Sequence, residues 1–181
     1  ILGSIYGAEE YKCSAIRTSL LSITNRSIFL VSKTLVWLVF SFFISFLSIF
    51  LTINMTHYVL GQDGLLLFSL NGTVWFYMFL ASIAWTLLGL LAYIMALTFK
   101  TAIVPLLFLL PQVYNLGTFL ANYISVAKFL PVALGQGLIA TSPQILEHNS
   151  LQNILFLLCW NFSFLALAIY RLLKSDIGGG E

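Results

Sequence analysis

Two adjacent glutamates, Glu9 and Glu10, are the residues whose type and spacing first suggest chemistry. Paired carboxylates can act as general acid and base, or can hold a metal ion when histidines accompany them. The two histidines of the chain, His57 and His148, instead fall in polar breaks between long apolar runs. No nucleophile with a neighbouring base stands out either. We therefore expect no catalytic residue and no metal site in this chain.

The composition predicts an integral membrane protein. Hydrophobic residues make up 60% of the sequence and charged residues 8%, and the mean hydropathy is +1.01. About a quarter of the residues are charged in soluble globular proteins. The small net charge of +2 gives no reason to expect a nucleic-acid partner. The two cysteines, Cys13 in a charged loop and Cys159 in an apolar run, predict no disulfide framework.

Four apolar segments have the length of a membrane span, for which about 20 residues are needed. None of them contains Asp, Glu, His, Lys or Arg between its ends. This argues against an intramembrane enzyme and against a transporter coupled to protons or sodium ions, because both need ionisable groups at depth. We predict these spans at residues 34–55, 73–98, 102–122 and 151–170.

Polar residues within the spans indicate where helices pack or bend. Ser41, Ser45 and Ser48 lie on one helix face, where they favour close helix packing and, less often, line a substrate path. In the third span, Pro105 and Pro111 predict a kinked helix, which would either move or simply improve packing. The same span carries Gln112 and Asn115, whose side chains should face protein or water. These two residues are our candidates for the substrate path.

The segment of residues 123–150 is apolar in part but too short and too interrupted by proline and glycine to cross a bilayer. We expect it to dip into the membrane and return. The segment of residues 1–8 is apolar and runs directly into charged residues, so we interpret it as the end of a preceding span.

Residues 9–33 form the only long charged segment and hold four of the eight Lys and Arg residues. Its apolar residues Ile16, Leu20 and Ile23 recur at helical spacing, which predicts a short surface helix. If this loop is cytoplasmic, only Lys128 lies outside, which agrees with the positive-inside rule. The remaining seven basic residues are then all inside: Lys12, Arg17, Arg26, Lys33, Lys100, Arg171 and Lys174.

The loop resembles the cytoplasmic loop between the second and third spans of ABC-2 type transporter permease subunits. In that family a Glu at a helix end is followed by a short coupling helix, an Arg, and a Lys that opens the next span; Glu10, Arg17, Arg26 and Lys33 match this order. The sequence from Tyr170 to Ile177 is similar to the usual ending of the family. The chain departs from the pattern where Gly-Thr is common, at Ser14-Ala15, and where Pro is common, at Ile23.

The resemblance implies an all-α protein of the cytoplasmic membrane and makes this chain a piece of a six-span subunit. It has four complete transmembrane helices plus the end of a preceding one, a cytoplasmic coupling helix and an outer re-entrant segment. Glu10, Arg17 and Arg26 would orient the coupling helix on a separate ABC ATPase subunit, and a second permease copy or homologue would complete a dimer. The sequence has no phosphate-binding loop, so ATP hydrolysis and any cofactor are expected elsewhere.

The expected function is therefore export from a bacterial cell, and not catalysis. Because no charged residue lines the spans, we expect an apolar or amphipathic cargo such as a drug, an antimicrobial peptide or a lipid-like molecule. The alternative is a membrane protein that does not transport, namely a scaffold, a sensor or an immunity protein that sequesters a peptide.

Overall fold

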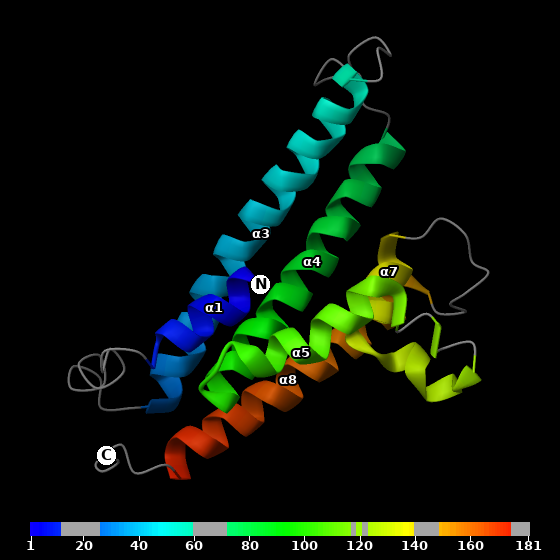
Figure 1. Ribbon diagram of the computed structural model, residues 1–181. Coiled ribbons are helices and arrows are strands. Elements are labelled where there is room, and N and C mark those ends of the chain that lie inside the picture. Colours follow the sequence, from blue (N-terminus) through cyan, green and yellow to red (C-terminus); the bar gives the residue numbers. More distant parts are fainter. Residues whose placement is uncertain (12–25, 60–71, 117–118, 121–122, 140–148, 175–181) are drawn as a thin grey trace.

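The structure is built from helices of very different lengths (Figure 1). The computed structural model describes residues 1–11, 26–59, 72–116, 119–120, 123–139 and 149–174. In this part of the chain there is no β-strand, which confirms the predicted all-helical class. Its α-helices include α1 (Leu2–Glu9), α3 (Arg26–Val59), α4 (Gly72–Phe99), α5 (Ile103–Pro111), α7 (Pro131–Ile139) and α8 (Ser150–Lys174).

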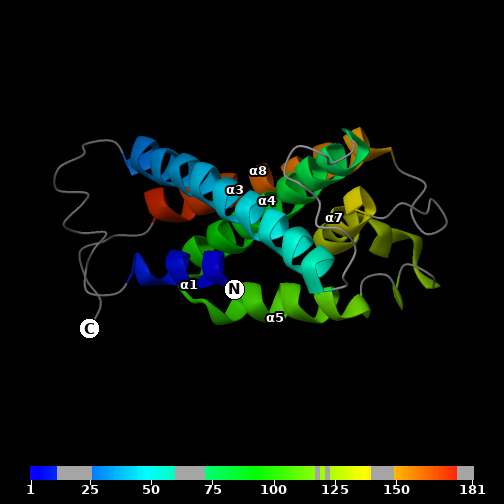
Figure 2. The same ribbon diagram turned by 90° about the horizontal axis from the view of Figure 1, so that it is seen from above.

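The central helix is α4, which contacts α1, α3, α5, α7 and α8. Its most apolar stretch is 83% buried, whereas the corresponding stretches of α3 and α8 are 11% and 22% buried. Figure 2 shows α1 and α5 along one edge of the molecule, away from α8. The apolar faces of α3 and α8 thus remain largely uncovered, as is typical of helices that face lipid.

Three helices, α3, α4 and α8, are long and apolar enough to cross a membrane by length and composition. They contain the spans predicted at residues 34–55, 73–98 and 151–170. Helix α3 begins eight residues earlier than the predicted span, since residues 26–33 contain no helix-breaking Gly or Pro. Lys33 consequently lies two turns inside α3 and does not open the helix.

The span predicted at residues 102–122 differs in the structure. Helix α5 ends at Pro111 and continues as a π-helix, η2 (Gln112–Leu116). The helical apolar stretch Ile103–Tyr114 is shorter than a crossing. Pro105 causes no break because it lies in the first turn of α5, where backbone N–H groups have no helical partner anyway. A fourth complete crossing therefore remains a prediction.

Helix α1 packs very closely on α4 through two glycines one turn apart. A Cβ atom at Gly3 would lie 2.3 Å from the carbonyl oxygen of Gly89, and one at Gly7 would lie 2.7 Å from that of Tyr93. Small residues at a spacing of four allow helix backbones to approach in this way. The segment interpreted as the end of a span is thus a helix held against the centre of the structure.

The predicted re-entrant segment contains a 3-10 helix, η3 (Ser125–Phe129), followed directly by α7. Leu134 and Leu138 of α7 pack against Ala84 and Leu87 of α4 and against Leu157 of α8. Because Ala84 and Leu87 lie near the middle of α4, α7 packs against the middle of the central helix and not against its end. Residues 140–148 lie outside the described part of the chain.

Candidate functional site

Four basic residues gather at one end of the helix group, which we call the basic end: Lys33, Lys100, Arg171 and Lys174. The first two turns of α3 and the last turns of α4 and α8 meet there, because Leu30, Leu97 and Leu172 share one apolar cluster. Figure 1 shows the end of α8 beside the start of α3. Lys128, in contrast, lies in η3, away from these ends. The structure thus separates Lys128 from the other basic side chains that it describes.

Glu10 and Lys33 form an ion pair that joins the end of α1 to α3. Glu10 is 8% exposed, and a carboxylate at this degree of burial needs a charged or hydrogen-bonding partner. Lys33 Nζ donates a hydrogen bond to Glu10 Oε2 and also lies 4.9 Å from the centre of the Phe29 ring. The two residues flank residues 12–25 in the sequence. The ion pair therefore holds together α1 and α3, the two helices that this segment connects.

Tyr11 adds a second anchor at the same place. Its hydroxyl donates a hydrogen bond of 2.8 Å to the carbonyl oxygen of Leu97 on α4. Burial, together with the negative charge of Glu10, raises the pKa of Tyr11 to about 12. The hydroxyl therefore stays protonated and able to donate at physiological pH.

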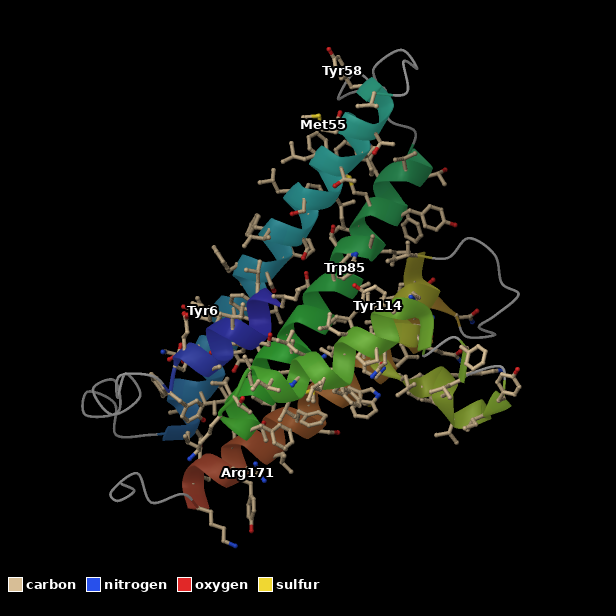
Figure 3. The ribbon with its side chains drawn as sticks, in the orientation of Figure 1. Tyr6, Met55, Tyr58, Trp85, Tyr114 and Arg171 are labelled. Atoms are coloured by element: carbon tan, nitrogen blue, oxygen red, sulfur yellow. The ribbon has the colours of Figure 1, made fainter. Side chains whose placement is uncertain are left out.

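A cavity of about 670 Å³ lies among α1, α3, α4 and α5. Its volume falls in the range of small-molecule sites, about 300–1,000 Å³. Its lining is mostly aliphatic and aromatic and contains no charged side chain. Figure 3 shows Trp85, one of the lining residues, in the middle of α4. The residues that line it from α3 and α4 are Trp37, Ser41, Ile44, Ser45, Ser48, Ile49, Thr52, Ile53, Trp85, Leu88, Gly89 and Ala92.

The serines that sequence analysis placed on one face of a helix all line this cavity. Ser41, Ser45 and Ser48, joined by Thr52, form a row of hydroxyl groups along its α3 wall. Ser41 donates a hydrogen bond to the Leu38 carbonyl and Thr52 to that of Ser48, so these two hydroxyls are satisfied within the helix. The three serines thus border a cavity, while their role in a substrate path stays a prediction.

Gln112 lies beside the cavity and not in its lining. It is 5% exposed; its Nε2 donates to the Phe108 carbonyl at 2.9 Å, and its Oε1 accepts a hydrogen bond of 3.4 Å from the Val132 backbone N–H. Its neighbour Val113 lines the cavity, as does Val132. Gln112 thus satisfies an N-terminal amide of α7, a role that its sequence neighbourhood did not indicate.

Trp160 of α8 holds the other side of the turn that leads into α7. Its Nε1 donates a hydrogen bond of 2.9 Å to the Phe129 carbonyl, and its ring lies 6.2 Å from that of Phe108 on α5. Phe108 and Gln112 are one helical turn apart. The turn between η3 and α7 is consequently tied to α5 and to α8 at once.

Comparison with known protein families, with curated proteins and with solved structures found no match. Of the predicted coupling residues, Glu10 is placed as above, Arg17 lies outside the described residues, and Arg26 begins α3. Asn115 lies in the π-helix η2, and its side chain is outside the description.

Two asparagines of α8, Asn153 and Asn161, are polar residues that sequence reasoning missed. Asn161 Nδ2 donates to the carbonyls of Leu157, at 2.8 Å, and of Leu87 on α4, at 3.3 Å. Asn153 is fully buried, and neither atom of its amide has a hydrogen-bond partner in the described part of the chain. Their spacing of eight residues, with Leu157 midway, is the helical signal that could have revealed this buried face.

Proposed function

We propose that this chain is the membrane-spanning permease subunit of an ABC-type exporter, working with a separate ATPase subunit and a second permease copy or homologue. In this proposal it is a multi-pass protein of the cytoplasmic membrane. It moves an apolar or amphipathic molecule, and ATP is hydrolysed by the partner.

The observation that carries the proposal is that α1 and α3 both line the cavity and are joined at the basic end. Residues 12–25, which include Arg17 of the coupling-loop motif, connect these two helices. Glu10 lies about 9 Å along α1 from Ser4, which lines the cavity, and Lys33 lies about 12 Å along α3 from Ser41. A movement of residues 12–25 would therefore be transmitted to the cavity walls through a few turns of α1 and α3.

The chemistry of the cavity supports a cargo without net charge. An ion entering an apolar cavity without charged partners would lose its hydration without compensation. Aromatic rings and a row of hydroxyl groups suit a molecule with a large apolar part and a few polar atoms. The predicted spans likewise contain no charged residue between their ends.

The orientation follows from the distribution of basic residues. With the basic end in the cytoplasm, Lys128 falls on the outer side, as the positive-inside rule favours. A cysteine-free variant carrying Lys128→Cys should react with an impermeant thiol reagent in intact cells, whereas the same variant carrying Lys174→Cys should react only after lysis. If only Lys174→Cys were labelled in intact cells, the orientation would be the opposite of the one proposed. The coupling segment would then lie on the side away from the ATPase.

The decisive experiment is reconstitution of the full-length permease with candidate ATPases in proteoliposomes. We expect ATP-dependent movement of a hydrophobic drug, lipid analogue or membrane-active peptide. Reversal of both Arg17 and Arg26 to Glu should abolish coupling, since interface charge pairs cost about 2–5 kcal/mol when one partner is lost from a buried position. Lys128→Glu is the matched control. Unchanged transport in the double reversal would contradict the assignment.

The rival function, a membrane immunity or scaffold protein, predicts a different result. Such a protein would protect cells from a peptide without any ATPase. Protection that persists when the partner ATPase carries an inactivating Walker A lysine substitution would favour this rival.

A further inference from the structure

A second pocket, lined in part by basic side chains, lies between the C-terminal ends of α4 and α8. Its volume is about 410 Å³, and it is separate from the apolar cavity because the two share no lining residue. Six residues line it: Thr98, Phe99, Lys100, Tyr170, Arg171 and Lys174. Figure 3 shows Arg171 at this end of α8.

Three of these side chains are cations with no carboxylate partner among the described residues. Arg171 is held in place by a hydrogen bond of 3.0 Å from Nη1 to the Thr98 carbonyl and by the Phe99 ring, 5.3 Å away. Lys174 Nζ lies 5.8 Å from the centre of the Tyr170 ring. Each helix C-terminus offers only about half a negative charge. Counted over the described residues, the pocket therefore has a surplus of positive charge that favours an anion.

The backbone at Lys100 gives a second, independent indication. Lys100 has φ 56°, and it is the only non-glycine residue with positive φ in the part of the chain that the structure describes. The left-handed conformation at a helix end is normally left to Gly or Asn, because a side chain costs free energy there. Such costs are concentrated at binding sites. Here the conformation places an ammonium group at the rim of the pocket, above the ring of Tyr11 at 5.6 Å.

Exposed apolar side chains of α5 and α8 flank the pocket. Ile103 and Leu107 of α5, which begins three residues after Lys100, are 64% and 71% exposed. Tyr170 and Leu173 of α8 are 62% and 58% exposed. A ligand that combines an anionic group with long apolar chains would match both the pocket and these flanks. A free anion, or an acidic protein surface, would leave the apolar flanks unused.

We propose that this pocket binds the phosphate group of an anionic phospholipid from the leaflet at the basic end. Lys100, Arg171 and Lys174 supply the charge, and a guanidinium group suits phosphate oxygens especially well. Basic pockets between helices at a membrane surface are a known form of lipid headgroup recognition. The site is independent of the proposed transport, since it requires only that the chain lies in a bilayer.

The test is lipid binding by the purified full chain, delipidated in a neutral detergent and titrated with phosphatidylglycerol or phosphatidylcholine under native mass spectrometry. We expect one phosphatidylglycerol molecule to be retained at a tight site and phosphatidylcholine to bind without such a site. Each neutralising substitution, Lys100→Asn, Arg171→Gln or Lys174→Gln, should weaken the tight site about fivefold, since a basic group near an anionic lipid contributes about 1 kcal/mol. Asn keeps the left-handed conformation at position 100 accessible.

Two controls separate the charge of the pocket from general effects. Arg171→Lys keeps the charge and should keep most of the affinity, whereas Lys128→Gln removes a charge elsewhere and should change nothing. Circular dichroism of the triple variant checks that the helices persist; if they do not, the three single variants carry the test.

Three outcomes would overturn the proposal. Retention of phosphatidylglycerol by the triple variant at the original affinity would show that the lipid binds elsewhere. Displacement of the lipid by millimolar inorganic phosphate would show a site for a free anion. If the triple variant bound the lipid unchanged but no longer associated with the purified ATPase, the pocket would be a contact site for the ATPase.

Discussion

Lys33 of α3 donates a hydrogen bond to Glu10, the residue that follows α1, and so joins the two helices at the basic end. Removing one charge leaves the other without compensation at a partly buried place. Glu10→Gln should lower the free energy of unfolding by about 2 kcal/mol, between the values for exposed and for buried pairs. Thermal unfolding in detergent measures this loss of stability. Glu9→Gln, the exposed neighbour, is the control, and the exchange Glu10→Lys with Lys33→Glu should recover part of the loss.

The close contact of α1 with α4 gives a second prediction. In Gly7→Ala the new Cβ would lie 2.7 Å from the Tyr93 carbonyl oxygen and 2.9 Å from the Ala96 Cβ, so α1 must move away. We expect a loss of about 1–3 kcal/mol, the usual cost of overpacking. In Gly89→Ala the new Cβ meets nothing within 4 Å, and helix propensity should leave stability unchanged or raise it by up to about 1 kcal/mol. Equal destabilisation by both variants would contradict the packing.

The sequence was sufficient to predict the three long helices α3, α4 and α8, because about 20 apolar residues without charges allow few other structures. It was also sufficient to place the three serines on one face, since that face follows from helical periodicity. It could not show that this face borders a cavity, because a cavity depends on how closely α5 and α1 approach α3. Nor could it predict that the helix expected at residues 102–122 changes to a π-helix after Pro111, where Gln112 accepts a long-range hydrogen bond from Val132.

The contact of Gln112 with α7 gives a third prediction. Gln112→Met keeps the length of the side chain but removes the acceptor for the Val132 N–H, which is then buried without a partner. The expected cost is about 1–3 kcal/mol. Hydrogen exchange followed by mass spectrometry should show faster exchange in the first turn of α7. Gln152→Met, at an exposed position of α8, should leave that peptide unchanged; slow exchange in both variants would mean that Gln112 does not hold α7.

The raised pKa of Tyr11 gives a prediction about pH. Tyr11 donates its proton to the Leu97 carbonyl, and its pKa rises from the ordinary value of 10.0 to about 12. The neutral form is favoured in the folded state, so its contribution is complete below pH 10 and is lost as the pH rises towards 12. Tyr11→Phe should lower stability by about 1 kcal/mol at neutral pH. The difference in melting temperature between the two proteins should shrink between pH 10 and 12; a constant difference would contradict this role.

The row of hydroxyl groups in the cavity gives the last prediction. Ser45→Leu replaces the hydroxyl oxygen on the α3 wall by a bulkier apolar group without introducing charge, so it should obstruct a bulky cargo while the helix itself remains stable. Ser163→Leu makes the same chemical change on the exposed face of α8 and is the matched control. In proteoliposomes with the partner ATPase, we expect Ser45→Leu to lose transport but to keep ATPase association, because Lys33 of the ion pair lies about 18 Å along α3 from the substitution. Ser45→Ala enlarges the cavity slightly and should transport normally. Normal transport by Ser45→Leu would place the cargo path elsewhere, and loss of transport by Ser163→Leu as well would mean that the leucine acts through the lipid-facing surface and not through the cavity.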